Sequence, residues 1–174
     1  GFRLRAMNEN QSLPRCELPS AASLAQKFPP DHILVVEDDA DIRQLNVEAL
    51  ERAGYQVDAA EDGAVAWRSL NSQTYDLMIT DQNMPRVSGL ELLKKLHAGR
   101  MALPVIMATG TIPTAEFTRC PWLQPAATLL KPYTLEALLQ TVQQILREVS
   151  LPADSSQLFM YREVKASPGD STSA

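Results

Sequence analysis

Five side chains in this sequence are of the types that can bind a phosphoryl group together with a hard metal ion. Carboxylate oxygens are the ligands that Mg²⁺ prefers, and an aspartate can itself accept a phosphoryl group as a covalent intermediate. A lysine ammonium and a threonine hydroxyl can hold the remaining phosphoryl oxygens by charge and hydrogen bond. The five residues, each at the carboxyl end of a short apolar run, are Glu37, Asp38, Asp81, Thr109 and Lys131. Together they predict phosphoryl transfer to an aspartate.

The three carboxylates would repel one another if the fold brought them together. Two such charges 4–5 Å apart repel by roughly 3–4 kcal/mol at an effective dielectric constant near 20. A proton or a cation must offset this repulsion, and Mg²⁺ binds through one or two carboxylates plus a phosphate oxygen. A single aspartate after a strand more commonly forms a turn or caps a helix, which is the role we expect for Asp39 or Asp41.

Apolar runs suited to buried strands alternate with helical patterns along residues 31–149. Strands are expected at 33–36, 56–60, 76–80, 104–108 and 127–130, and helices at 42–53, 63–70, 90–96, 114–119 and 135–149. Leu45 belongs to the apolar stripe of the first helix, and Gly54 is expected to end that helix. The alternation predicts an α/β fold with a parallel sheet. A flavodoxin-like, doubly wound five-stranded sheet of order 2-1-3-4-5 would make strands one and three neighbours and collect the carboxylates where such sheets bind ligands.

The segment between the fourth and fifth strands breaks this rhythm. It contains Pro113, Pro121 and Pro125. Proline is tolerated in the first turn of a helix, but in the interior it removes a hydrogen bond and clashes with the preceding turn. We therefore expect the fourth helix to be short or distorted and to be followed by an irregular stretch that holds Trp122.

Length and composition indicate one globular domain with two tails. The 174 residues are 45% hydrophobic and 21% charged, and the formal net charge is −5. The acidic balance argues against a free-standing nucleic-acid binder, and no apolar run approaches the roughly 18 residues that span a bilayer. Two cysteines, Cys16 and Cys120, are too few for a disulfide framework, so we expect reduced thiols and a cytoplasmic location. The expected divisions are a leader at 1–30, a folded domain at 31–149 and a tail at 150–174.

Four short motifs in this order resemble the receiver domain of bacterial two-component response regulators. They are Ile-Leu-Val-Val-Glu-Asp-Asp at 33–39, Ile-Thr-Asp-Gln-Asn-Met-Pro at 79–85 with Ser88-Gly89, Met-Ala-Thr-Gly at 107–110, and Leu-Lys-Pro-Tyr at 130–133. The resemblance covers about 31–149. It implies a phosphorylation switch that catalyses only its own phosphotransfer and dephosphorylation, and so is not a turnover enzyme.

The resemblance also assigns the metal ligands and the phosphorylation site. Asp81 resembles the phosphoacceptor, and Asp38 resembles the acid that binds Mg²⁺ directly. Glu37 corresponds to the neighbouring acid that acts mainly through water. Asn83 is expected to offer its backbone carbonyl to the metal.

Residues after the fourth and fifth strands receive roles in the same way. Thr109 resembles the hydroxyl residue that moves toward the phosphoryl group, and Gly110 the small residue that leaves access for the donor. Lys131 resembles the lysine that pairs with phosphoryl oxygens, and the peptide bond before Pro132 is expected to be cis. Asn83 and Thr111, each two residues after a site residue, are candidates for setting the lifetime of the phosphoryl group.

One position departs from the family. Receiver domains usually have tyrosine or phenylalanine three residues before the lysine, and that ring turns inward on phosphorylation. Here the position is Thr128. The chemistry should survive because its ligands are intact, whereas the conformational readout through Thr109 and Thr128 is expected to differ. Tyr133 is the nearest aromatic residue, and we expect it to pack rather than to replace the switch.

The resemblance implies a sensor histidine kinase or a histidine phosphotransfer protein as the phosphodonor. Only 25 residues follow position 149, too few for a DNA-binding domain with its own core. We therefore expect a downstream protein target, with no direct contact to nucleic acid or membrane. A single-domain regulator and a receiver taken from a hybrid kinase or larger regulator both fit, and a homodimer stays open.

Two functions of other classes remain as alternatives. The first is a phosphohydrolase of the haloacid dehalogenase type, which usually has Asp-x-Asp at its nucleophile, whereas Gln82 and Asn83 follow Asp81 here. The second is a binding module that does not need phosphate, which the absence of an aromatic residue at Thr128 would favour.

Overall fold

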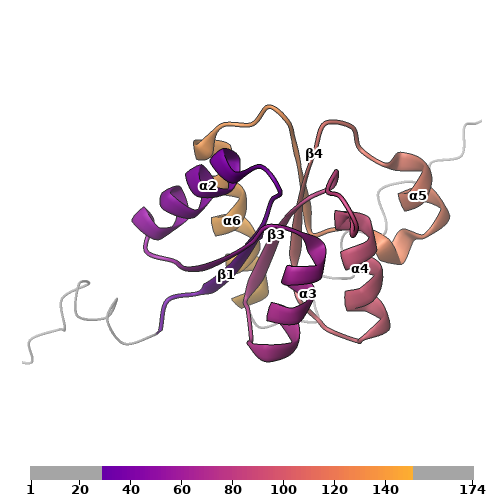
Figure 1. Ribbon diagram of the computed structural model, residues 1–174, viewed down its shortest axis with the longest axis horizontal. Helices are drawn as coiled ribbons and strands as arrows, with labels where there is room; N and C mark the ends of the chain where they lie inside the picture. The colour runs from indigo at the N-terminus through magenta and orange to yellow at the C-terminus, as the bar shows by residue number, and fades with distance from the viewer. Residues whose placement is uncertain (1–28, 151–174) are drawn as a thin grey trace, which may run out of the picture.

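Five parallel strands form one sheet at the centre of the protein (Figure 1). The computed structural model describes residues 29–150, so the predicted tails at 1–30 and 150–174 lie outside the described residues, apart from 29, 30 and 150. The strands are β1 His32–Val36, β2 Gln56–Ala60, β3 Leu77–Asp81, β4 Val105–Thr109 and β5 Ala127–Leu130. Their order is β2-β1-β3-β4-β5 and every pair is parallel. This confirms the predicted flavodoxin-like α/β fold.

Helices cover both faces of the sheet. Between residues 29 and 150 the α-helices are α2 Ala40–Arg52, α3 Gly63–Ser72, α4 Gly89–Ala98, α5 Thr114–Arg119 and α6 Leu135–Ser150, with a 3₁₀ helix, η1 Pro121–Leu123. Helices α2 and α6 lie on one face, and α3, α4 and α5 lie on the other (Figure 1). None of these helices has the length and apolar composition needed to cross a bilayer.

The central strands are buried on both faces because helices cover both sides of the sheet. Side chains of β1 alternate between two apolar clusters. Leu34 and Val36 belong to the cluster that includes α3 and α4, whereas Ile33 and Val35 belong to the cluster that includes α2 and α6. Strands β3 and β4 are buried along their whole length. The ends of β1, β3 and β4 are therefore held by packing on two sides.

Side-chain caps begin the helices that follow β1 and β3. The Asp39 carboxylate accepts hydrogen bonds from the backbone N–H groups of Asp41 at 2.9 Å and Ile42 at 3.1 Å, so Asp39 has the predicted capping role. Ser88 begins α4 with a capping box. Gly54 has a φ of 98° and follows the end of α2, as predicted.

The fourth predicted helix is short, as expected, but the stretch after it is more regular than predicted. Helix α5 has 6 residues, and Trp122 lies in the 3₁₀ helix η1 rather than in an irregular loop. Pro121 occupies the first turn of η1, where its fixed φ is compatible with a helix and its missing N–H breaks no bond. Phe117 and Leu123 are buried and anchor the segment against the sheet.

The apolar stripe predicted for the first helix is wrong at Leu45. Its side chain is 54% exposed, and Asn46 beside it is buried instead. The Asn46 amide donates a hydrogen bond of 3.0 Å to the hydroxyl of Tyr133, so this polar side chain is satisfied inside. Leu135, the first residue of the strong stripe in α6, is also 41% exposed. Periodicity located the helix, but the contact with Tyr133 decided which residue of α2 points inward.

Gly89, the first residue of α4, lies against the backbone of the residue that ends β3. A Cβ atom at Gly89 would lie 2.6 Å from the carbonyl oxygen of Asp81 and 3.2 Å from the Cα atom of Gln82. Backbone atoms cannot turn aside as a flexible side chain can. Glycine therefore lets α4 begin directly beside the carboxyl end of β3.

Gly89→Ala is expected to lower the free energy of unfolding by about 1–3 kcal/mol, because the added methyl group overpacks this contact. Urea unfolding followed by circular dichroism measures the change. Gly110→Ala is the matched control, because a Cβ there would meet no atom within 4 Å, and its effect should stay within about 0.5 kcal/mol. Equal stabilities for Gly89→Ala and wild type would contradict the argument.

Candidate functional site

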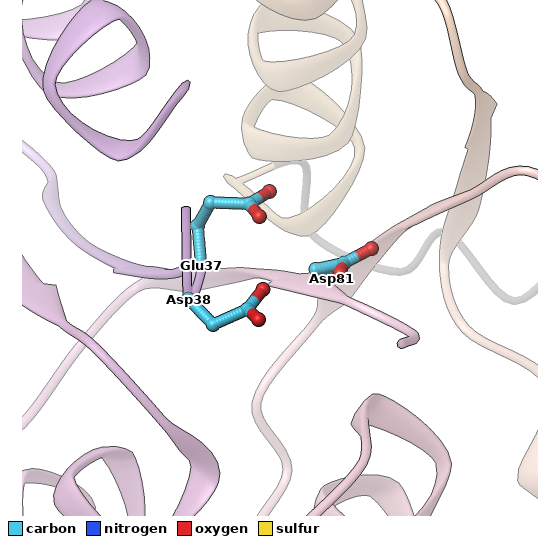
Figure 2. A group of neighbouring side chains, drawn as sticks. All are labelled: Glu37, Asp38 and Asp81. Atoms are coloured by element: carbon cyan, nitrogen blue, oxygen red, sulfur yellow. The ribbon is translucent and has the colours of Figure 1, made fainter. Parts of the chain in front are cut away.

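Three carboxylates meet at the carboxyl ends of two neighbouring strands. Glu37 and Asp38 follow β1, and Asp81 is the last residue of β3. Strands β1 and β3 are paired directly, with Val36 opposite Thr80. One carboxylate oxygen from each acid lies within 4.8 Å of those of the other two. Figure 2 shows Glu37 and Asp38 on opposite sides of the end of β1, with both side chains extending in the direction of Asp81.

Lys131 reaches this group from the loop after β5. Its Nζ atom lies 3.0 Å from Oε2 of Glu37 and 3.1 Å from Oδ1 of Asp81. Glu37 and Asp81 are buried, at 3% and 5% exposure, whereas Asp38 is exposed. The structure thus brings together Glu37, Asp38, Asp81 and Lys131, as the sequence predicted. Three carboxylates and one ammonium leave two negative charges in a site where Glu37 and Asp81 are buried and Asp38 is exposed.

The electrostatics of the site follow from burial and from the lysine bridge. Burial raises the pKa of Glu37, and the nearby charge of Asp81 raises it further, while the hydrogen bond from Lys131 opposes both effects. Burial acts against the charged form of Lys131, but hydrogen bonds to Glu37 and Asp81 outweigh it, so the pKa of Lys131 is raised. The ammonium therefore stays charged at neutral pH.

The Asp38 carboxylate is the acid left free to bind a cation. Among residues 29–150, the structure gives it no hydrogen-bond or ion-pair partner. The donor set consists of carboxylate oxygens and carries two uncompensated negative charges, a composition that fits Mg²⁺. Hard oxygen ligands and a matching charge make this the candidate metal centre of the domain.

Thr109, Asn83 and Gly110 make no hydrogen bond to the three carboxylates in the part of the chain that the structure describes. Thr109 is fully buried at the end of β4, where its hydroxyl donates a 2.7 Å hydrogen bond to the carbonyl of Thr111. The N–H of Thr111 donates back to the same hydroxyl at 3.2 Å. The Thr109 hydroxyl is thus engaged within its own turn. Asn83 and Gly110 are exposed in the loops after β3 and β4.

Position 128, where receiver domains usually have an aromatic residue, is a threonine, and the nearest aromatic residue, Tyr133, is hydrogen-bonded to another element. Thr128 is partly buried on β5 and pairs with Met107 of β4. Tyr133 is held to α2 through Asn46, and burial raises the pKa of its hydroxyl. The Lys131–Pro132 peptide bond is cis, as the resemblance implied.

Sequence reasoning missed one residue that contacts the acid-bearing loop. The Arg43 guanidinium on α2 donates hydrogen bonds to the backbone carbonyls of Glu37 at 2.7 Å and Asp38 at 3.3 Å. A basic residue one turn into the helix that follows an acid pair is the available signal. It is too common on surface helices to be decisive without the structure.

Residues 33–143 match the family described as the response regulator receiver domain. This match covers well over half of the chain and includes every site residue described above and all five strands, apart from His32 at the start of β1. The chain belongs to the response regulator receiver family. Membership in this family favours the receiver over the phosphohydrolase alternative; the matched residues include Glu37, Asp81 and Lys131.

Response regulators, sensor kinases and transcriptional regulatory proteins all contain segments similar to the chain. It is 33% identical over 114 residues to the response regulator receiver protein CpdR of Brucella abortus, covering 66% of this chain and 95% of CpdR. It is 34% identical over 125 residues to the sensor histidine kinase RcsC of Salmonella typhi, covering 72% of this chain but 13% of RcsC. The receiver domain therefore resembles both a whole small regulator and one part of a much longer kinase.

Solved receiver structures have the same fold. The chemotaxis response regulator CheY4 of Vibrio cholerae superimposes with a TM-score of 0.62 at 30% identity, covering 67% of this chain and 98% of CheY4. The response regulator TrrA of Thermotoga maritima, described in complex with Mg(2+)-BeF, gives a TM-score of 0.58 at 30% identity, covering 66% and 98%. The five-stranded architecture is therefore that of known response regulators.

The raised pKa of Glu37 predicts how the metal-free receiver responds to pH. A raised pKa means that folding favours the protonated carboxyl, so this contribution to stability is present below about pH 4.3 and is lost as pH rises through the raised value. In EDTA, the unfolding free energy of wild type minus that of Glu37→Gln should fall as pH rises from about 4 through the raised pKa of Glu37. Urea titrations across this range measure it, and a difference that does not vary with pH would contradict the assignment.

Proposed function

We propose that this receiver domain accepts a phosphoryl group from a phosphohistidine onto Asp81, with Mg²⁺ held by the neighbouring acids. It then signals by phosphorylation-dependent contact with another protein. The observation that carries the proposal is the position of Asp81. Its carboxylate lies 3.1 Å from Lys131 Nζ and within 4.8 Å of the carboxylates of Glu37 and Asp38. A nucleophile, a fixed cation and the ligands for a metal thus share one pocket.

In the transfer step, a carboxylate oxygen of Asp81 forms the new P–O bond as the N–P bond of the phosphohistidine breaks. The imidazole leaves with the bonding electron pair and takes up a proton from water. Later attack by water on the acyl phosphate restores the carboxylate and releases inorganic phosphate and a proton. The domain thereby modifies and resets itself, so its role is that of a switch.

The acids would have different roles in binding the metal. Asp38 and Asp81 would bind Mg²⁺ directly, Glu37 would act mainly through water, and Asn83 would contribute its backbone carbonyl. When bound, Mg²⁺ would neutralise charge that builds up on the phosphoryl oxygens during transfer. Glu37 also holds Lys131 in place through the 3.0 Å hydrogen bond.

Lys131 and Thr109 would bind the phosphoryl oxygens that the metal does not. Lys131 already contacts the Asp81 carboxylate, so it needs to move little to meet a phosphoryl group there. The Thr109 hydroxyl must first leave the carbonyl of Thr111. Asn83 and Thr111, both exposed and each two residues after Asp81 or Thr109, are candidates for setting the lifetime of the phosphoryl group. With threonine at position 128, the conformational response cannot use an inward-turning ring there.

Asp81→Asn is expected to abolish phosphorylation of the protein by Mg²⁺ and acetyl phosphate. Wild type should gain one phosphoryl group, because the ionised Asp81 carboxylate is the only nucleophile assigned to the pocket. Intact-mass spectrometry at short reaction times measures the incorporation. Label that persists on Asp81→Asn would show that the acceptor is another residue. If wild type takes up no label, and binds a partner protein equally well with and without acetyl phosphate, the phosphate-independent binding module would be favoured.

An apolar groove beside the site offers a surface for the phosphodonor. Its volume is about 470 Å³, and it runs along α2 to the loop after β5. The residues that line it are Ile42, Leu45, Asn46, Lys131, Pro132, Tyr133 and Leu135. Leu45 and Leu135 are the exposed leucines noted above, and Lys131 joins the groove to the acid pocket. A helix of a histidine kinase or histidine phosphotransfer protein that lies in this groove would bring its phosphohistidine near Asp81.

Leu45→Gln should slow phosphotransfer from such a donor about tenfold, the loss expected from removing roughly 1.4 kcal/mol of apolar contact. Labelling by acetyl phosphate should not change, because the small donor does not need the groove. Transfer from an autophosphorylated histidine kinase that labels wild type provides the measurement. Val149→Gln is the control, since Val149 is 61% exposed on α6 and does not line the groove. Equal transfer rates for wild type and Leu45→Gln would rule this surface out.

A further inference from the structure

Arg43 directs its guanidinium to the main chain that carries the acid pair. Its Nη1 atom donates hydrogen bonds to the carbonyl of Glu37 at 2.7 Å and to that of Asp38 at 3.3 Å. Two other arginines in the described residues pair with carboxylates instead: Arg52 with Glu48 and Arg86 with Asp62. Arg43 makes no ion pair with a carboxylate among residues 29–150.

The two carbonyls that Arg43 binds have left the regular hydrogen-bond pattern of the sheet. The N–H of Glu37 still donates to the carbonyl of Ala60 on β2, at 3.1 Å, so the ladder continues to that point. Beyond it, β1 has ended and α2 has not begun. Among the described residues, Arg43 is the one recorded donor to the carbonyls of Glu37 and Asp38. The hydrogen bond to the Glu37 carbonyl is partly buried, and a carbonyl withdrawn from water needs a partner, which a side chain from the next helix supplies here.

We infer that Arg43 is a positioning residue for the metal site. By binding the carbonyls of Glu37 and Asp38, it holds the backbone of this pair so that both carboxylates face Asp81. Asp38 depends on this most, because its exposed carboxylate has no partner of its own in the described part of the chain. The inference rests on the proposed function, since it assumes that these acids bind a divalent cation.

Because Arg43 is positively charged, the direction in which its removal changes the affinity for a metal ion tests the inference. A positive charge near the site repels a divalent cation, so an arginine that acted only through its charge would weaken metal binding. Its removal would then raise the affinity. An arginine that orders the ligands has the opposite effect: its removal should lower the affinity for the metal. Part of the binding free energy would then be used to order the loop that carries Glu37 and Asp38. An arginine important only for folding would change the melting temperature and leave the affinity of the folded protein unaltered.

The experiment is a titration of the unphosphorylated full chain with Mn²⁺, read from the loss of the free-ion electron paramagnetic resonance signal. Mn²⁺ takes the same oxygen ligands as Mg²⁺. Arg43→Ala is expected to raise the Kd at least threefold, and Arg43→Lys, which keeps a donor and the charge, is expected to restore most of the affinity. Arg52→Ala is the control, since it removes the same charge from the far end of α2, where Arg52 is 81% exposed. Its Kd should match that of wild type.

An unchanged or lower Kd for Arg43→Ala would overturn the inference. Asp38→Asn separates this outcome from failure of the proposed function. If wild type binds Mn²⁺ no better than Asp38→Asn, the metal site itself is wrong. If Asp38→Asn loses binding and Arg43→Ala does not, only the role of Arg43 is wrong. Circular dichroism verifies folding, and if Arg43→Ala does not fold, Arg43→Met keeps the apolar stem of the side chain and carries the same test.

Discussion

Repulsion between three crowded carboxylates is the constraint on which the rest of this structure depends. Glu37, Asp38 and Asp81 place oxygens within 4.8 Å of one another, and two of these acids are buried. Lys131 offsets part of the repulsion by bridging Glu37 and Asp81. Leaving a buried charge without its partner is strongly destabilising, so the position of the lysine is as much a part of the site as the acids. The remaining negative charge is of the sign that a bound cation would neutralise.

The sheet keeps the charges at these distances. Strands β1 and β3 are buried between two helical layers, and their ends cannot shift without disturbing both apolar clusters. Lys131 lies in the loop after the edge strand β5, which pairs with β4. Helix α6 packs against one face of the sheet. The loop that follows Asp81 has little freedom, because α4 begins at Gly89 directly against the Asp81 carbonyl. Side chains at these strand ends are thus held more rigidly than side chains on free loops would be.

Around this centre lie the residues of the proposed response to phosphate and of the proposed recognition surface. The Thr109 hydroxyl is bound within its own turn, so the described conformation is one in which it does not contact the acids. Thr128 cannot supply the ring movement common in the family. Tyr133 is held by Asn46 of α2 and lines the apolar groove. The proposed recognition surface therefore involves α2 and the loop after β5, whereas the proposed response to phosphate involves Thr109 at the end of β4.

The sequence by itself determined the order of strands and helices, because apolar period and turn residues are local properties. It also identified the acids and Lys131, because in a parallel sheet of this order the carboxyl ends of the strands must meet. Local pattern could not decide that Leu45 faces solvent while Asn46 is buried, since that depends on Tyr133, 87 residues away in the sequence. Nor could it decide that Arg43 would bind backbone carbonyls and not an acid. Those outcomes depend on how α2 packs against the rest of the fold, which only the tertiary structure specifies.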